Sequence, residues 1–286
     1  MQRGSPDVKR LMHISAKIKS AQILGKLRPK QRLVISIFSY LIIISRRKEF
    51  AMHTVSIPQH VVERGRKQRG GKEHIFDVLD MSKVAHVIVD LQKGFVGEGA
   101  PVEVPLTREI FENVNAISQA VRDGGGLNVF LRYTYDPHEQ LPWNVWFENY
   151  MDERQFALMK EAFARGADDW QLSSELDVAA GDLIVDKTRF SALIPGTCDL
   201  DQQLKARGID TLIITGTLTN CCCESTARDA LQMGYNVIFL TDANATLSDE
   251  EHNATLISMA AIFADVVDTC HLLALIDKSV KMKAAA

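Results

Sequence analysis

Three consecutive cysteines, Cys221, Cys222 and Cys223, are the residues of this chain whose type and placement most suggest chemistry. They follow an apolar run and a short polar turn, and the residues after them fit a helix. A thiol at a helix N-terminus faces unpaired N–H groups and the positive end of the helix dipole, which lower its pKa and favour the nucleophilic thiolate. Packing in the core is the common alternative for a free cysteine. The cluster is therefore a candidate nucleophile.

Two other ionisable residues follow short apolar runs typical of buried parallel strands. Asp90 comes directly after residues 84–89, and Lys187 comes after residues 183–186. Ligands of parallel α/β sheets bind outside the carboxyl ends of the strands, so we expect Asp90, Lys187 and the cysteines to meet at one edge. Each residue alone has an ordinary explanation, since a strand-end carboxylate often caps a turn and a strand-end lysine is usually solvated. Their shared location favours a site.

A thiol that attacks an amide carbonyl needs a group to take its proton, and that group is usually histidine. None of the core histidines follows a strand next to the cysteines, and His86 lies inside the first strand, where we expect a hydrogen-bonded core residue. A carboxylate can be the base when burial raises its pKa, and a lysine can hold a thiolate as an ion pair. Asp90 and Lys187 can therefore replace histidine beside a cysteine.

The rest of the chain alternates between strand and helix patterns. Apolar runs predict strands at residues 84–89, 127–133, 183–186, 211–215, 237–240 and 266–267. Periodicity and capping residues predict helices at 107–122 with Thr107 as N-cap, 148–164, 199–207, 222–233 and 248–264 with Ser248 and Glu251 as a capping box, and at the C-terminus. Such alternation predicts an α/β fold, in which a parallel sheet carries helices on both faces.

The composition bounds the class of protein. With 286 residues and 46% hydrophobic content, the chain is long enough for one sizeable α/β domain with an appendage. Five cysteines, an odd number with three adjacent, do not suggest a disulfide framework and indicate a reducing compartment, so we expect a cytoplasmic protein. The sequence has no internal repeat, which excludes solenoid folds.

Charge divides the chain in two. The overall charge is −3, but residues 1–51 carry twelve Lys and Arg against two acidic residues, a net of +10, which leaves −13 for residues 52–286. The apolar run at 33–44 is shorter than the ~20 residues that span a bilayer. For residues 1–51 a signal peptide, an organelle presequence and a non-native start before Met52 stay open, and the last is favoured.

We therefore expect three segments: a basic extension at residues 1–51, a polar arm at 52–78 and the α/β domain at 79–286. The extension has few aromatic residues that could stack on bases, so a nucleic-acid partner is not expected, and neither is a membrane. The basic run at 64–72 is interpreted as a solvated surface of the arm.

Three motifs carry a resemblance to a known family. They are VDLQKGF at residues 89–95, DKTRFSA at 186–192 and GTLTNCCCESTARDA at 216–230. In this order and spacing they resemble the isochorismatase-like cysteine hydrolase superfamily, over about residues 75–276. The resemblance implies a three-layer α/β/α sandwich around a six-stranded parallel sheet, in a homo-oligomer that we expect to be a dimer or tetramer.

The resemblance also implies roles for single residues. Asp90 is the implied general base, Lys187 the partner of the base and the thiolate, and Cys222, the second residue after the asparagine of the third motif, the nucleophile. Cys221 and Cys223 become flanking residues, and we expect Cys223 to face the core.

Around the nucleophile the resemblance implies a cis peptide bond from Thr217 to Leu218 and an oxyanion hole made by the N–H groups of Leu218 and Cys222. The implied reaction is a two-step amide hydrolysis: the thiol attacks a carbonyl carbon, ammonia or an amine leaves, and water hydrolyses the thioester. It needs no cofactor. A catalytically inactive binding module of the same fold is the alternative from another class, and the presence of all three residues argues against it.

Branches of the superfamily differ in features that this sequence can be checked for. True isochorismatases lack a cysteine at the nucleophile position, so that activity is not expected. Nicotinamidases carry an Asp-x-His-x-x-His metal motif, of which residues 136–138 match only the first half, so we expect no metal and a turn at Asp136-Pro137. The cysteine motif and the polar arm look closest to ureidoacrylate amidohydrolases. We expect a small ureido, carbamoyl or amide substrate, with a nicotinamidase-like or other amidase activity as the alternative.

Substrate contacts are expected from two places. Gln92 and Phe95 follow Asp90 closely in the first motif, and Trp143 and Trp146 lie in a segment rich in proline and aromatic residues. Ordinary packing or an oligomer interface explains the two tryptophans equally well.

Overall fold

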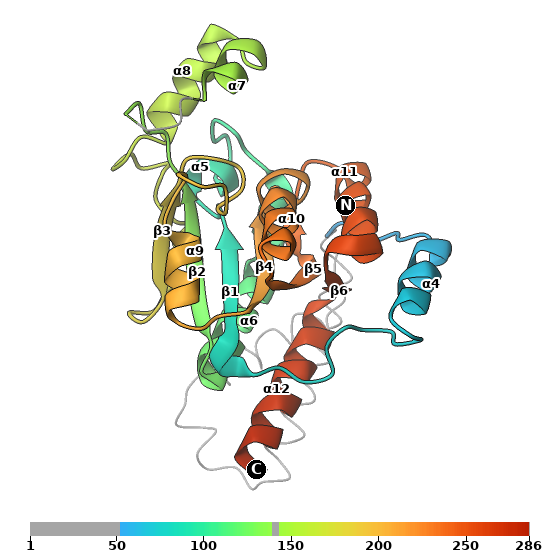
Figure 1. Cartoon of the computed structure of the whole chain (residues 1–286). Helices are drawn as coiled ribbons and strands as arrows, with labels where there is room; N and C mark the ends of the chain where they lie inside the picture. Colours follow the sequence, from blue (N-terminus) through green and yellow to red (C-terminus); the bar gives the residue numbers. More distant parts are fainter. Residues whose placement is uncertain (1–51, 139–142, 286) are drawn as a thin grey trace, which may run out of the picture. The chain divides into compact units, whose positions relative to one another are not determined.

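The computed structural model describes residues 52–138 and 143–285, so the extension predicted at residues 1–51 lies outside the described residues. The core is a six-stranded parallel sheet in the order β3-β2-β1-β4-β5-β6 (Figure 1). The strands are β1 (Val84–Val89), β2 (Leu127–Tyr133), β3 (Leu183–Lys187), β4 (Thr211–Thr217), β5 (Asn236–Ala245) and β6 (Asp265–Val267). The predicted six-stranded parallel sheet is confirmed.

Helices cover the sheet and connect its strands. The α-helices are α4 (Gln59–Gln68), α5 (Lys93–Val96), α6 (Phe111–Gly124), α7 (Asn144–Asn149), α8 (Glu153–Ala162), α9 (Leu200–Ala206), α10 (Glu224–Gln232), α11 (Asp249–Ser258) and α12 (Thr269–Ala285). The shorter turns are the 3-10 helices η1 (Met81–Lys83) and η2 (Pro105–Glu109) and the π-helices η3 (Thr219–Cys223) and η4 (Met259–Phe263).

The side chains of β1 alternate between two apolar layers. Val84 and Ile88 pack with residues of α6 and α12 on one face, while Ala85, Val87 and Val89 pack with residues of α9, α10 and α11 on the other. All residues of β1 are buried, because helices cover both faces of the parallel sheet. A strand in this position is expected to be a nearly continuous apolar run. Burial of each such aliphatic side chain contributes about 1.5–3 kcal/mol. The predicted three-layer α/β/α sandwich is confirmed.

The strand order places the site. From β1 the chain proceeds through β2 to β3 on one side of the sheet, and from β4 through β5 to β6 on the other. The order therefore reverses between β1 and β4, and ligands of open α/β sheets bind outside the carboxyl ends of strands at such a point. Asp90 follows β1, and the cysteines follow β4.

Two helix predictions need correction. Thr107 does not cap α6, since it lies in η2 and its hydroxyl donates to the Val104 carbonyl oxygen at 2.6 Å; α6 begins at Phe111. The helix predicted at 148–164 is two helices, α7 and α8. The break occurs because the Asp152 carboxylate accepts a hydrogen bond from the Gln155 N–H at 2.7 Å and so caps a new helix.

The polar arm predicted at residues 52–78 contains a helix, α4, which the sequence did not predict. Val61 of α4 is buried, and the helix packs closely against η4 at Gly65, where an added Cβ would lie 3.3 Å from the Ala260 carbonyl oxygen. The arm is therefore partly docked on the domain. No helix within residues 52–138 and 143–285 is both long enough and apolar enough to cross a membrane.

Candidate active site

Asp90 sits at the end of β1 in a backbone conformation that few residues adopt. Its φ is +52°, in the left-handed region, which aspartate tolerates better than most side chains. The Asp90 N–H still donates to the Leu131 carbonyl oxygen at 3.2 Å, so the turn stays tied to β2. The side chain is fully buried. A residue held in this way at a strand end is a candidate functional group.

Lys187 reaches Asp90 from two strands away. It is the last residue of β3, paired in register with Tyr133 at the end of β2, and its side chain is fully buried. The Lys187 Nζ lies 2.7 Å from Asp90 Oδ2, 3.0 Å from the Arg189 carbonyl oxygen and 5.6 Å from the centre of the Tyr133 ring. A long, flexible side chain is needed to span β2, and the ammonium is held by a carboxylate, a carbonyl and a ring face.

Cys222 lies in η3, between β4 and α10, and only 4% of the residue is exposed. A glycine at the end of β4 lets this turn approach Asp90. Gly216 has a φ of +119°, and a Cβ there would overlap the Val89 carbonyl, so only glycine lets β4 approach β1 at this end. The cis peptide bond implied by the resemblance is present between Thr217 and Leu218.

The structure brings Asp90, Lys187 and Cys222 together. The Cys222 thiol lies within hydrogen-bonding reach of Asp90, where it lowers the pKa of that carboxyl against the larger effect of burial, and within electrostatic reach of Lys187. Asp90 Oδ1 nevertheless has no hydrogen-bond partner of ordinary geometry among the described residues. A buried carboxylate oxygen without a partner is costly, and here it is the oxygen left to accept a proton.

Burial and charge set the protonation states of the three groups. Burial raises the pKa of Asp90, and the Lys187 ammonium opposes this. For Lys187, burial alone would lower the pKa, but the Asp90 carboxylate gives the largest opposing effect and the pKa is raised. A hydrogen bond with Cys221 and burial raise the pKa of the Cys222 thiol well above its usual range. The resting site therefore combines a neutral thiol, an ammonium and a carboxyl group of increased basicity.

The lowered thiol pKa expected at a helix N-terminus does not hold for Cys222. α10 begins only at Glu224, and the N–H groups of Cys221 and Cys223 both donate to the Leu218 carbonyl oxygen, at 3.1 and 3.2 Å. These N–H groups are therefore not available to stabilise a thiolate, and burial prevails. Cys223 is fully buried against β4, as expected, whereas Cys221 is partly exposed.

The oxyanion hole implied for Leu218 and Cys222 stays a prediction. Leu218 lies between the end of β4 and the turn that contains Cys222. An N–H in that position is a suitable donor to a developing negative charge.

Gln92 and Phe95 lie next to Asp90, but their visible contacts are with the protein itself. The Gln92 amide accepts from the Tyr133 N–H at 2.7 Å and donates to the carbonyl oxygens of Tyr133 and Trp170 at 2.9 and 2.8 Å. Phe95 is buried, and its ring lies 4.7 Å from that of Phe163. Gln92 thus ties the end of β2 to the segment before β3, and substrate contacts by either residue stay predictions.

The two tryptophans gather beside the loop that follows Lys187. The Trp143 and Trp146 rings stand edge-on to Phe190, with centres 4.7 and 5.2 Å away, and the Arg189 guanidinium lies 5.0 Å from the Trp143 ring centre. Sequence reasoning missed Arg189 and Phe190, although both belong to the second motif. An aromatic wall with one guanidinium therefore lies beside the loop that follows Lys187.

Asp136 and His138 form the predicted turn. The Asp136 carboxylate accepts a hydrogen bond from the His138 N–H at 2.9 Å, which is an Asx turn. Outside residues 1–51 and 139–142, which the structure does not describe, no three His, Cys, Asp or Glu side chains are grouped to hold a metal ion. The absence of a metal stays a prediction.

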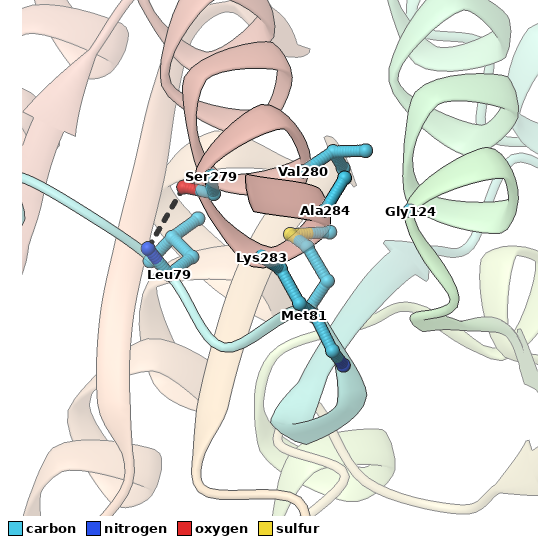
Figure 2. Close-up of a pocket in the computed structure, with 7 residues that line it drawn as sticks. All are labelled: Leu79, Met81, Gly124, Ser279, Val280, Lys283 and Ala284. Atoms are coloured by element: carbon cyan, nitrogen blue, oxygen red, sulfur yellow. Dashed lines mark hydrogen bonds between the residues drawn. The ribbon is translucent and has the colours of Figure 1, made fainter. Parts of the chain in front are cut away.

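The hollow in Figure 2, of about 240 Å³, does not coincide with this site. It is lined by residues of η1, the end of α6 and α12, among them Met81, Gly124 and Lys283. These elements lie at the amino ends of β1 and β2, so this hollow is at the opposite edge of the sheet from Asp90.

Comparisons with known proteins agree with the geometry. The isochorismatase domain model matches residues 84–270. An uncharacterized isochorismatase family protein of Bacillus subtilis, YwoC, is 37% identical over 182 residues, which are 62% of this chain and 86% of that protein. A ureidoacrylate amidohydrolase of Yersinia enterocolitica is 32% identical over 209 residues, 68% of this chain and 90% of that protein.

A nicotinamidase and a solved structure are also similar. Nicotinamidase 3 of Arabidopsis thaliana is 39% identical over 105 residues, 36% of this chain and 52% of that protein. The crystal structure of a cysteine hydrolase from Pseudomonas syringae pv. phaseolicola superposes with a TM-score of 0.65 at 28% identity, covering 73% of this chain and 99% of that one.

Proposed function

The chain belongs to the isochorismatase domain family, and we propose that it is a cysteine amidohydrolase that cleaves a carbon–nitrogen bond of a small ureido, carbamoyl or amide compound. Cys222 is the nucleophile, Asp90 the general base and Lys187 the cation beside both. One observation carries the proposal: Lys187 Nζ lies 2.7 Å from Asp90 Oδ2 in a fully buried pair next to Cys222, while Asp90 Oδ1 is left without a partner among the described residues.

The first half-reaction acylates the enzyme. Asp90 takes the thiol proton as the Cys222 sulfur attacks the carbonyl carbon, a step that burial favours because it raises the pKa of Asp90. The Lys187 ammonium stabilises the negative charge while it moves from carboxylate to sulfur. The N–H groups of Leu218 and Cys222 are proposed to hold the oxyanion, and one such donor contributes about 10²–10³-fold to the rate.

Departure of the nitrogen completes the first half-reaction, and the second half-reaction then releases the acyl group. The protonated Asp90 gives its proton to the leaving nitrogen as the C–N bond breaks, so ammonia or an amine departs and a thioester or thiocarbamate remains on Cys222. Asp90, again a carboxylate, removes a proton from water, and the resulting hydroxide attacks the acyl carbon. Sulfur then leaves and recovers that proton, which returns the site to its resting state. A carbamate released in this way breaks down to carbon dioxide and ammonia.

A ureido or carbamoyl substrate is favoured over other amides. The ureidoacrylate amidohydrolase relative is matched over 90% of its length, whereas the nicotinamidase is matched over 52%. The Arg189 guanidinium beside Trp143 suits a small planar substrate that carries a carboxylate. Gln92, Phe95, Trp143 and Trp146 remain the proposed substrate contacts. We also propose a cytoplasmic homo-oligomer of two or four copies, without a nucleic-acid or membrane partner.

A nicotinamidase-like activity is the second candidate, because Asp136 and His138 keep half of that metal motif. The two candidates differ in their need for metal. We expect EDTA to leave the activity unchanged, since the chemistry proposed for Cys222, Asp90 and Lys187 uses no metal. A large loss that zinc or iron restores would favour the nicotinamidase-like candidate.

Ammonia release tests the proposed function. The purified chain is assayed against ureidoacrylate, N-carbamoyl amino acids, biuret and nicotinamide, with Cys222→Ala as the matched control and circular dichroism to check its fold. We expect turnover to be fastest with a ureido or carbamoyl compound and absent in the variant. A folded wild-type protein that hydrolyses none of these compounds, and no simple amide either, would support the inactive binding module instead.

A further inference from the structure

His53 has a buried side chain in a largely exposed segment that the family match does not include. It precedes α4 in the polar arm, 31 residues before the match begins at residue 84. Its side chain is only 3% exposed, whereas the three residues after it are exposed. When one histidine side chain is buried and its neighbours in the segment are exposed, the histidine has a specific partner.

The partners of His53 lie in the turn after β5 and in α11. The ring stacks on the His252 ring, with centres 4.2 Å apart and planes 11° from parallel. Nδ1 lies 2.8 Å from Asp249 Oδ1, and Nε2 lies 3.0 Å from the Thr246 backbone nitrogen. A backbone N–H can only donate, so Nε2 accepts, and Nδ1 therefore carries the proton that it donates to Asp249. Both ring nitrogens and one ring face of His53 are thus occupied.

Two hydrogen bonds continue from these partners to the nucleophile turn. The Thr246 hydroxyl donates to Asn220 Oδ1 at 2.7 Å, and His252 Nδ1 lies 3.0 Å from the Thr219 hydroxyl oxygen. His252 Nε2 lies 3.0 Å from the Thr241 carbonyl oxygen and must donate to it, so Nδ1 accepts from Thr219.

The charge state of His252 keeps this chain of contacts intact. His252 is fully buried, and burial lowers its pKa to about 4, so the ring stays neutral and continues to accept from Thr219 at physiological pH. Thr219 and Asn220 are the third and second residues before Cys222 and lie with it in η3. The polar arm therefore reaches the turn that carries the nucleophile through two separate routes.

We propose that His53 is a positioning residue, through which the polar arm holds the turn that presents Cys222 to Asp90. This inference rests on the proposed function in one respect, that Cys222 is the reacting thiol. A small displacement of a nucleophile is costly, because about 1 Å of misplacement can reduce a rate by ~10²-fold. If His53 only anchored the arm, its loss would change stability and leave the reactivity of Cys222 as it is.

Two substitutions separate hydrogen bonding from stacking at His53. Phenylalanine keeps a ring on His252 but cannot accept from the Thr246 N–H, whereas glutamine keeps one donor and one acceptor without the ring. His60→Ala is the matched control, since His60 lies in the same arm and is exposed. We expect His53→Phe to lower kcat about 10-fold with KM changed less than about 2-fold, His53→Gln to recover part of the loss, and His60→Ala to match the wild type.

A second readout does not depend on the substrate. The rate at which iodoacetamide alkylates Cys222 is followed by peptide mass spectrometry, with thermal unfolding as the check that each variant is folded. We expect this rate to change several-fold in His53→Phe, in parallel with kcat, and not in His60→Ala. Equal alkylation rates and equal kcat in folded His53→Phe, His53→Gln and wild-type protein would overturn the positioning role. An altered alkylation rate in a protein that hydrolyses no compound would contradict only the proposed amidohydrolase activity.

Discussion

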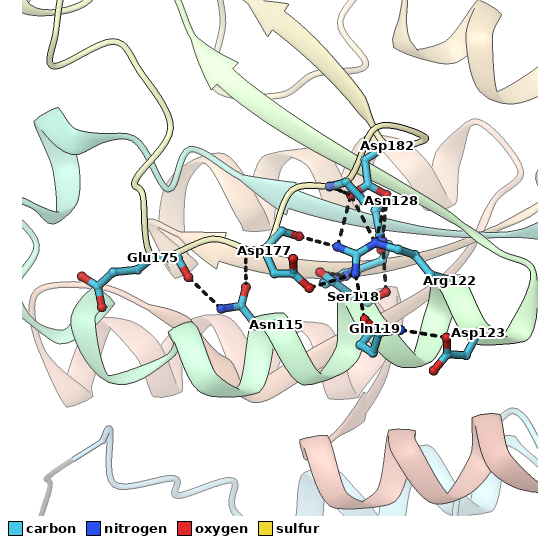
Figure 3. A network of polar contacts seen from close by, with 11 residues as sticks. Asn115, Ser118, Gln119, Arg122, Asp123, Asn128, Glu175, Asp177 and Asp182 are labelled. Carbon is cyan, nitrogen blue, oxygen red and sulfur yellow. Dashed lines mark hydrogen bonds and ion pairs between the residues drawn. The ribbon is translucent and has the colours of Figure 1, made fainter. Parts of the chain in front are cut away.

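Asp90 and Asp182 are two aspartates with buried side chains at opposite ends of the same sheet, and their carboxylates are used very differently. Asp182, just before β3, accepts hydrogen bonds at both oxygens: from the Arg122 guanidinium at 3.2–3.3 Å, from Asn128 Nδ2 at 3.1 Å and from the Ala179 N–H at 2.8 Å (Figure 3). The Asp90 carboxylate has Lys187 at Oδ2, and Oδ1 has no hydrogen-bond partner of ordinary geometry among the described residues. A saturated carboxylate joins elements together, whereas an unsaturated one can accept a proton.

The surroundings of the two carboxylates follow the same division. Arg122 is planar and bonds Asp182 and also Asp177, so the network in Figure 3 ties the end of α6 to the segment before β3. Lys187 is a point charge on a long chain, and it leaves one oxygen of Asp90 open to Cys222. The comparison indicates that burial alone does not make a carboxylate a base. The carboxylate must also have an oxygen whose hydrogen bonds are incomplete.

The largest expected effect is that of Asp90→Asn. An amide cannot take the thiol proton, so we expect kcat to fall by at least about 10³-fold, with the variant still folded. Steady-state ammonia release and a thermal melt measure the two effects. If Asp90→Asn keeps more than a tenth of wild-type kcat, Asp90 is not the base and the contrast with Asp182 loses its meaning.

Lys187→Met is expected to have the next largest effect. The ammonium opposes the rise in the pKa of Asp90 that burial causes, so its removal raises this pKa further. Because the base must be unprotonated, the acid limb of kcat/KM should move to higher pH, and kcat should fall about 10²-fold even at the new optimum. A pH–rate profile measures this, and an acid limb that stays in place or moves to lower pH speaks against the pair.

Acid should destabilise the folded protein, because two of its buried histidines are neutral. His86 of β1 is fully buried, with Nε2 2.8 Å from the Thr215 hydroxyl oxygen, and burial lowers its pKa to about 3; that of His252 is lowered to about 4. The unfolded chain binds protons that these neutral rings do not. Their contribution to the free energy of unfolding is therefore complete above pH ~6.5. It is lost as the pH falls toward 3–4, by about 1.4 kcal/mol per pH unit for each histidine. Urea unfolding between pH 7 and 4.5 tests this sign, and a free energy of unfolding that does not fall contradicts it.

Asp182→Asn should have the smallest effect on catalysis. It weakens the bonds to Arg122 but keeps an acceptor, so we expect the free energy of unfolding to fall by about 1–2 kcal/mol while kcat stays within about 2-fold of wild type. Denaturant unfolding measures the free energy of unfolding, and the ammonia assay on the same preparation measures kcat. A large loss of kcat would show that the two ends of the sheet are coupled and would break the comparison.

The sequence predicts which strand ends meet, because the signals for this are local. Asp90 and Lys187 each follow an apolar strand directly, and the sheet order then brings the strand ends together. The choice of Cys222 over its neighbours needed the resemblance, since the three cysteines share one local pattern. In the structure Cys222 and Cys223 are buried, whereas Cys221 is partly exposed.

Contacts between distant polar residues could not be predicted. His53 and Thr246 are 193 positions apart, and hydrogen bonding between them leaves no periodic pattern in the sequence. The same holds for Gln92, whose three backbone partners come from two other segments. The break before α8 could have been predicted from the sequence, since Asp152, three residues before Gln155, is a capping signal.

The acyl-enzyme formed during turnover tests the central claim most directly. Wild-type protein is mixed with its best substrate, quenched in acid and examined by intact-protein and peptide mass spectrometry, beside Cys222→Ala. We predict one adduct, on Cys222, with the mass of the substrate's acyl group, and neither adduct nor turnover in the variant. An adduct on Cys221 or Cys223, or turnover that survives in Cys222→Ala, would contradict the account.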